Sequence, residues 1–252
     1  MRLPSRALKA FTLAALPLAL AACGPSGSSG ATGAAASGSP SSAPAVENPN
    51  AGLLRGTELK KVLAPASYFP SGFAAQADLT RDTGAHYRAP ATKSAAKPDC
   101  THLGYTGWVD LTGIEGVSFA QSGFINDATS AELDQEIDVY RGDTAADVMK
   151  GLAAVVAACP TYHETDPAST VKVTGAAKGG IGDETYTITL TDSAWESGTT
   201  LIAARVGTAV VTVLSTDGAD NGAASAKKLA AQIVTSLKGK TDAATDAAAA
   251  QG

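Results

Sequence analysis

The chain has 252 residues, of which 44% are hydrophobic but only 5% aromatic, and its formal net charge at pH 7 is −5. This length allows one core of ordinary size, and the shortage of aromatic residues means that the core is built from Ala, Val, Leu and Ile. The net charge is mildly negative, and the basic residues form no stripe that could contact phosphates. Both features argue against nucleic acid as a partner.

Residues 1–22 have the features of a bacterial signal peptide. A positively charged start is followed by an apolar run, residues 10–20, that is too short to span a bilayer. The run leads into Leu-Ala-Ala-Cys at residues 20–23, which resembles a lipobox. The resemblance implies cleavage before Cys23 and a diacylglycerol thioether on that cysteine, a modification that is labelled by palmitate. An ordinary secretory signal with a chance cysteine is the alternative, and both predict a location outside the cytoplasm.

Two stretches have compositions that do not support folding. Residues 23–52 are rich in Gly, Ser, Ala and Pro without an apolar period, so they bury too little surface to fold. We expect them to form a flexible tether between a lipid anchor on the extracytoplasmic face of the cell membrane and one folded domain, residues 53–240. Residues 241–252 are rich in Ala and are expected to form a disordered tail.

The domain is expected to begin with a helix over residues 53–64. Thr57 is its predicted N-cap, and Leu59, Val62 and Leu63 are predicted to face inward. Residues 66–99 have no strong period and contain three prolines, so we interpret them as irregular covering structure.

Residues 116–125 and 132–141 are predicted strands, and the second alternates between apolar and acidic side chains. This pattern predicts one buried face and one solvated face, as in antiparallel sheets. The apolar positions are Leu133, Ile137 and Val139, and the acidic positions are Asp134, Glu136 and Asp138.

Residues 144–159 show an apolar stripe at helical spacing that ends at Cys159, just before a proline. Thr144 is the predicted N-cap, with Asp147 in a capping-box position. The other cysteine outside the leader is Cys100, which begins a short aromatic stretch, residues 100–108. Since an extracytoplasmic location permits disulfides, we predict a Cys100–Cys159 disulfide that joins the two halves of the domain.

The second half of the domain is predicted to contain four strands and a last helix. The strands are residues 170–175, 184–191, 199–206 and 208–215, and the helix begins near Asp220. Antiparallel hairpins with separate helices indicate an α+β fold, a single domain with an antiparallel sheet covered by helices.

The order of these elements resembles the PknH-like extracellular sensor domain, a family of receptor-kinase ectodomains and free-standing lipoproteins. Matching features include Cys100 before an aromatic turn, the helix that carries Cys159, Gly182-Asp183-Glu184 before a strand and the Arg205-Val206-Gly207 hairpin. The resemblance covers about residues 53–237 and implies a non-catalytic role in ligand sensing or protein interaction. The kinase-linked members have two disulfides, whereas this chain has cysteines for one.

Motifs for catalysis, phosphate binding and metal binding are missing from the sequence. His86, His102 and His163 are widely separated, so we predict neither a catalytic site nor a metal site, and no cofactor. Tyr68, Trp108, Tyr162 and Trp195 are candidates to line a ligand cleft, although packing in the core is the simpler interpretation.

The preferred function is therefore a membrane-anchored lipoprotein that binds a small ligand or an envelope protein and is not an enzyme. A ligand is expected at residues 66–99 and at the loops around Tyr162 and Trp195, because binding residues concentrate on loops. A carrier of an apolar cell-envelope molecule and an envelope hydrolase are the alternatives.

Overall fold

The computed structural model describes residues 48–92, 97–165 and 168–249, which belong to one compact unit. The predicted signal peptide, Cys23 and most of the predicted tether lie outside the described residues. None of the described helices has both the length and the hydropathy needed to cross a bilayer.

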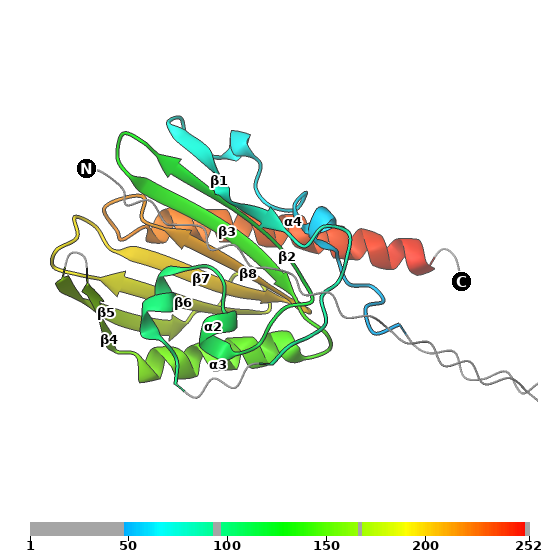
Figure 1. The fold of residues 1–252 in the computed structure, drawn as a ribbon. Helices are drawn as coiled ribbons and strands as arrows, with labels where there is room; N and C mark the ends of the chain where they lie inside the picture. Colours follow the sequence, from blue (N-terminus) through cyan, green and yellow to red (C-terminus); the bar gives the residue numbers. More distant parts are fainter. Residues whose placement is uncertain (1–47, 93–96, 166–167, 250–252) are drawn as a thin grey trace, which may run out of the picture. The chain divides into compact units, whose positions relative to one another are not determined.

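The domain is built on one antiparallel sheet of eight strands, in the order β1-β2-β3-β8-β7-β6-β5-β4 (Figure 1). This confirms the expected α+β fold. The strands are β1 (Phe73–Asp82), β2 (Ser118–Asn126), β3 (Ala131–Val139), β4 (Thr161–Thr165), β5 (Ala168–Ala177), β6 (Glu184–Thr191), β7 (Thr199–Val206) and β8 (Ala209–Ser215).

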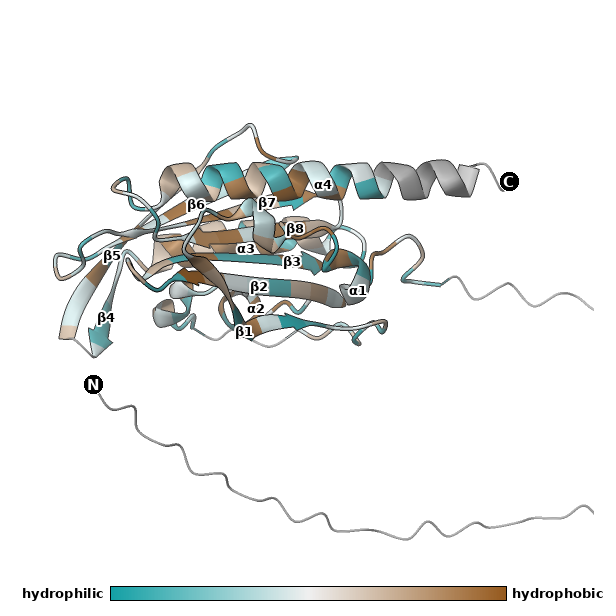
Figure 2. Ribbon diagram, turned by 90° about the horizontal axis from the view of Figure 1, so that it is seen from above, coloured by the Kyte–Doolittle hydropathy of each residue, from teal (hydrophilic) through white to brown (hydrophobic). Residues whose placement is uncertain are grey.

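Helices cover both faces of the sheet. The helix α4 (Ala223–Ala249) packs against β7 and β8 on one face, and α3 (Thr144–Ala158) packs against β5, β6 and β7 on the other (Figures 1 and 2). Each face has its own hydrophobic core, as expected for a sheet whose strands alternate inward and outward residues. The shorter helices are α1 (Gly56–Leu59), α2 (Val109–Thr112), and the 3₁₀ turns η1 (Ala66–Tyr68) and η2 (Cys100–Gly104).

The segment between α1 and η1 is attached to the sheet by a buried glutamine. Gln135 lies on β3, on the face that α4 covers, and its side chain is fully buried. Its Oε1 accepts a hydrogen bond of 2.8 Å from the Ala64 N–H, and its Nε2 donates to the Ala64 carbonyl at 2.9 Å and to Ser122 Oγ at 3.0 Å. The amide therefore satisfies both backbone groups of Ala64 in the core.

The predicted Cys100–Cys159 disulfide is present and joins η2 to the C-terminal end of α3. Leu103, Trp108 and Leu152 are fully buried beside it, in the core that α3 covers. Leu103, Tyr105 and Trp108 are expected from the sequence to pack around the disulfide; Leu103 and Trp108 do, whereas Tyr105 is 65% exposed, so that part of the expectation is wrong.

Two strands were not predicted, and both lie at the edges of the sheet. The strand β1 lies within residues 66–99, which were expected to be irregular, and its register against β2 shifts between Gln76 and Arg81. The strand β4 buries only Tyr162. An edge strand with an irregular register or a single buried residue lacks the period-two pattern by which strands are recognised.

The ends of three helices also differ from the prediction. The first helix is limited to α1 and is capped at Arg55, whose N–H donates to the Glu58 carboxylate at 2.9 Å, and not at Thr57. The N-cap of α3 is Asp143 and not Thr144. Helix α4 continues past residue 240, where we expected the disordered tail to begin, to Ala249.

Candidate functional site

A polar cleft of about 690 Å³ lies on the face of the sheet opposite α4, over β1, β2 and β3. Its other wall is the segment from η2 to α2, including residues 104–110, together with residues 114–116. Trp108 fixes this wall to the sheet, because its Nε1 donates a hydrogen bond of 2.7 Å to Thr212 Oγ1 on β8. The cleft is therefore bounded by a regular sheet and by a loop that the disulfide and Trp108 hold in place.

Four acidic side chains of β3 lie along the base of the polar cleft, and we call them the acidic row: Glu132, Asp134, Glu136 and Asp138. They share one face because they occupy alternate positions of a strand. This face was predicted to be solvated, and that prediction is wrong, since Asp134 is only 8% exposed and Glu136 only 6%. The η2–α2 segment covers a face that the alternation alone assigned to water.

The acidic row is only partly satisfied by hydrogen bonds. Thr106 Oγ1 donates a bond of 2.6 Å to Glu136 Oε2. In contrast, Asp134 Oδ1 and Asp138 Oδ2 are buried and have no hydrogen-bond partner among the described residues. A buried polar atom without a partner is uncommon in a folded protein and requires an explanation.

Burial raises the pKa values of three members of the acidic row, Asp134, Glu136 and Asp138, and neighbouring carboxylates add to the effect at Asp134 and Asp138. Burial, and then the neighbouring Glu132 carboxylate, raise the pKa of Asp134 to about 9. Burial also raises the pKa of Glu136, although the Thr106 hydrogen bond and the charge of Arg81 act against it. The pKa of Asp138 is raised well above its usual range by burial and by the Glu136 charge. Carboxyl groups with such pKa values are typical of functional sites in clefts.

Two arginines, Arg81 and Arg88, line the polar cleft. A side chain of the sheet binds Arg81, and a side chain of the opposite wall binds Arg88. Arg81 Nε, on β1, donates a bond of 2.9 Å to Gln121 Oε1 on β2. Arg88 Nη1 lies 3.1 Å from Glu115 Oε1, and its guanidinium lies over the Phe119 ring at 4.7 Å. The Arg88–Glu115 contact is exposed and the Arg81–Gln121 bond is only partly buried, so the arginines compensate the deeper carboxyls only weakly.

The unpartnered oxygen of Asp134 lies against a glycine. A Cβ atom added at Gly123, directly opposite on β2, would come within 2.4 Å of Asp134 Oδ1 and within 2.6 Å of Leu79 Cδ1. Leu79 belongs to the part of β1 where the register shifts. Gly123 therefore makes room both for the Asp134 carboxyl and for the side chain that β1 folds over it.

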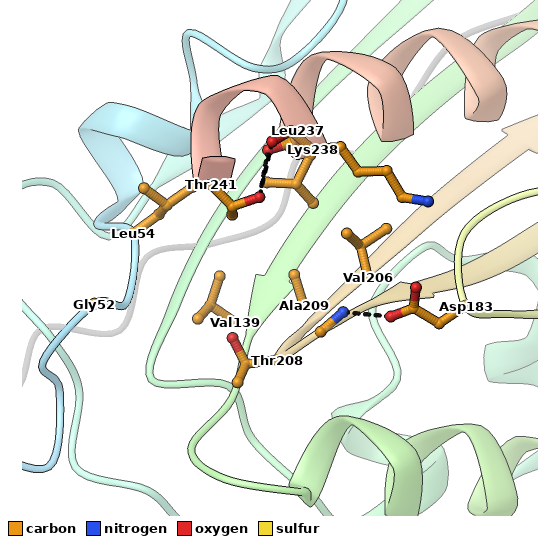
Figure 3. Close-up of a pocket in the computed structure, with 11 residues that line it drawn as sticks. Gly52, Leu54, Val139, Asp183, Val206, Thr208, Ala209, Leu237, Lys238 and Thr241 are labelled. Atoms are coloured by element: carbon orange, nitrogen blue, oxygen red, sulfur yellow. Dashed lines mark hydrogen bonds between the residues drawn. The ribbon is translucent and has the colours of Figure 1, made fainter. Parts of the chain in front are cut away.

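A smaller hollow of about 440 Å³ lies on the other side of the molecule's central strands, beside α4 (Figure 3). Leu54, Val139, Val206 and Leu237 give it a mostly apolar lining. Two of its polar side chains already have partners, since Asp183 Oδ2 accepts from the Gly207 N–H at 2.7 Å and Thr241 Oγ1 donates to the Lys238 carbonyl at 2.9 Å. It offers a ligand less polar recognition than the polar cleft does.

The residues singled out in the sequence are dispersed in the structure. His86 lies in the loop after β1, His163 is exposed on β4, and only His102, on η2, lines the polar cleft. Within the described residues, no three side chains among His, Cys, Asp and Glu are grouped as metal ligands.

The four aromatic residues that were candidates to line a ligand cleft also lie in different parts of the domain. Trp108 lines the polar cleft, whereas Tyr162 is buried in the core beneath α3, Trp195 packs at the border of that core, and Tyr68 packs against the core beneath α4. Residues 66–99, where a ligand was expected, do contribute Asp78, Leu79, Arg81 and Arg88 to the cleft.

Sequence reasoning missed the acidic row as a site. The signal was present, because acids at four alternate positions of one strand form a line on one face. It was interpreted as a solvated face since nothing local to β3 indicates that residues 104–110 fold across it.

The chain thus has an α+β fold in which helices cover both faces of one antiparallel sheet. Its fold is similar to that in the crystal structure of the extracellular domain of PknH from Mycobacterium tuberculosis, with a TM-score of 0.51 and 13% sequence identity, over 73% of this chain and 97% of that one. This confirms the expected resemblance at the level of the fold. The sequence matches no protein-family profile and no curated protein.

Proposed function

We propose that this protein is a lipid-anchored lipoprotein of the cell envelope whose extracytoplasmic domain binds a ligand, without chemical conversion, in the polar cleft. The observation that carries the proposal is the buried Asp134 carboxyl, which lines the cleft with one oxygen unpartnered. The similarity of the fold to an extracellular domain supports the location.

Two glycines provide a test that separates the polar cleft from the rest of the surface. A Cβ atom at Gly107 would have only the Glu136 carboxylate within 4 Å, at 3.8 Å, so the backbone accepts a side chain there and Gly107→Phe directs a ring toward the base of the cleft. Gly179, in the exposed loop between β5 and β6, has nothing within 4 Å of its added Cβ, so Gly179→Phe is the matched control.

Native mass spectrometry of protein purified from its host is the measurement. We expect a small molecule to copurify with the wild type and with Gly179→Phe and to be absent from Gly107→Phe at an unchanged melting temperature. A ligand that remains on Gly107→Phe would place binding elsewhere and contradict the proposal.

The anchor is tested separately through Cys23. The Leu-Ala-Ala-Cys sequence at residues 20–23 motivates it. Metabolic labelling with radioactive palmitate should mark the wild type and not Cys23→Ser, and the wild type should fractionate with membranes. An unlabelled wild type released into the medium would show that the signal is an ordinary secretory one.

An envelope hydrolase is the second candidate, because a carboxyl group that stays protonated near neutral pH is what a general acid requires. Glycosidases place two carboxyls on opposite sides of the bond that they cleave. The acidic row lies along one strand and therefore approaches a ligand from one side, which favours binding. Release of sugars from peptidoglycan by the purified protein, abolished by Asp134→Asn, would establish the hydrolase.

A further inference from the structure

We propose that the acidic row binds the protonated nitrogens of a linear di- or polyamine that lies along β3. This inference rests on the proposed function, since it takes the polar cleft as the ligand site and names the chemistry of its ligand.

The unpartnered oxygens define what the ligand must supply. Asp134 Oδ1 and Asp138 Oδ2 are buried and have no hydrogen-bond partner among the described residues. The hydrogen bonds that these two carboxyl groups do make are with neighbouring acids, Asp134 with Glu132 and Asp138 with Glu136, and both bonds raise the pKa. Leaving a buried acceptor unsatisfied costs about 1–3 kcal/mol, and hydrogen bonds in which both partners are charged are the stronger ones. An ammonium group provides three N–H donors and a positive charge, so it meets both requirements. A quaternary ammonium has the charge but no donor.

The charge of the side chains around the polar cleft favours a cationic ligand over an anionic one. Seven carboxyl side chains and two arginines line the cleft. The carboxyl residues are Asp78, Asp110, Glu115, Glu132, Asp134, Glu136 and Asp138. The raised pKa values of Asp134, Glu136 and Asp138 favour their neutral forms, yet the four other carboxyl side chains still outnumber the two arginines. A phosphate or carboxylate ligand is therefore disfavoured, whereas a cation is attracted into a cleft that concentrates the field.

The spacing of the acidic row favours a linear ligand with more than one nitrogen. Alternate residues of a strand are about 7 Å apart, so the carboxyls repeat at that interval along β3. A flexible chain with amino groups separated by a few methylenes presents its charges at a similar interval. A single metal ion requires ligands that converge on one point, and no such group of three is present in the described part of the chain.

Binding of this kind is coupled to proton release. The free carboxyl of Asp134 holds its proton at neutral pH, because its pKa is about 9. When an ammonium ion enters, the carboxyl ionises, its proton passes to the buffer, and the ion pair forms. Affinity should therefore increase from pH 6 to pH 9, a range in which an alkylamine with a pKa of about 10 stays protonated. The charged or titratable groups that line the cleft with Asp134 are Glu132, Glu136 and Asp138 on β3, Asp78 and Arg81 on β1, and Arg88, His102, Tyr105, Asp110, Glu115 and Tyr140.

Isothermal titration calorimetry of the full chain in detergent tests the proposal with putrescine and spermidine as probes. Tetramethylammonium at the same ionic strength is the control for charge without N–H donors. We expect spermidine to bind more tightly than putrescine, and tetramethylammonium not to bind. Titrations in two buffers of different ionisation enthalpy should show protons released on binding, and the affinity should rise with pH.

Variants assign the effect to the acidic row. Asp134→Asn and Asp138→Asn should each weaken spermidine binding at least tenfold, and Asp134→Asn should reduce the number of protons released. Asp147→Asn, at an exposed position on α3, should change neither quantity. Equal binding by the wild type and Asp134→Asn would overturn the proposal.

The outcomes distinguish this inference from the proposed function. If the wild type binds neither amine at millimolar concentration while a neutral or anionic molecule copurifies and is lost in Gly107→Phe, the inference is wrong and the cleft remains the ligand site. If, in addition, no copurifying ligand is lost in Gly107→Phe, the proposed function fails as well.

Discussion

The indole Nε1 of Trp108 donates a hydrogen bond of 2.7 Å to Oγ1 of Thr212, a residue 104 positions further along the chain. Both side chains are buried, Trp108 to within 1% of full burial and Thr212 completely. Thr212 lies beside Glu136 in the pairing of β8 with β3, so this bond holds the wall of the polar cleft next to the acidic row. It links the shape of the site to the disulfide-bonded core.

The first prediction concerns this hydrogen bond. Trp108→Phe removes the donor and part of the ring, so the unfolding free energy should fall by about 2–4 kcal/mol. Thr212→Val removes the acceptor at similar volume and should reduce it by about 1–3 kcal/mol. Denaturant unfolding of both single variants and the double variant gives the coupling energy. A coupling near zero would show that the bond does not hold the wall.

A second prediction concerns Gln135. Methionine has a similar volume and flexibility but no N–H donor, so Gln135→Met leaves the Ala64 N–H and carbonyl unsatisfied in the core. We expect the unfolding free energy to fall by about 2–4 kcal/mol, measured by urea denaturation. Ser122→Ala, which removes only the bond at 3.0 Å, should cost about 1 kcal/mol. Similar losses in the two variants would contradict the role assigned to Gln135.

The central strands and long helices could be predicted from the sequence because their signals are local. The alternation of Tyr186, Ile188 and Leu190 with threonines places β6, and the apolar stripe from Val148 to Val156 places α3. The cysteine count and the expected extracytoplasmic location predicted the disulfide, since Cys23 belongs to the lipobox-like sequence and only Cys100 and Cys159 remain to pair.

The candidate site could not be predicted because it depends on contacts between distant segments. Gln135 is a polar residue at an apolar position of β3, and only its bonds to Ala64, 71 residues away, explain its burial. Asp134 is a polar residue at a polar position, and its burial depends on Leu79 and on the η2–α2 segment. The sequence around β3 gives no indication that these distant segments bury Gln135 and Asp134.

The third prediction is the contribution of the disulfide to stability. Cys100 and Cys159 are separated by 59 residues, so in the chain-entropy model the bond stabilises the domain by about 4 kcal/mol. Replacing both cysteines by alanine should lower the unfolding free energy by that amount, mainly through a less restricted unfolded chain. Treatment of the wild type with reductant should produce a similar loss, and reductant should not affect the double variant. A double variant as stable as the oxidised wild type would refute this contribution.

The last prediction is that the stability of the ligand-free domain falls as pH rises. The Asp134 carboxyl has a pKa of about 9 in the folded state and about 3.9 in an unfolded chain. Between these values the folded state binds more protons than the unfolded state, so the unfolding free energy decreases with pH, by up to about 1.4 kcal/mol per unit for one such group. Well below about pH 3.9 the carboxyl is protonated in both states and contributes no slope.

Denaturant unfolding at pH 5, 6, 7 and 8 measures this slope. Asp134→Asn keeps the shape of the side chain without the titration, so its slope should be smaller and its stability at pH 8 should exceed that of the wild type. Asp147→Asn, exposed on α3, should retain the wild-type slope. The raised pKa values of Glu136 and Asp138 have the same sign, so a residual slope should persist in Asp134→Asn and decrease further when Asp138→Asn is added. A wild-type stability that rises from pH 5 to pH 8 would show that the acidic row is ionised in the folded protein, and that the cleft already compensates its charge.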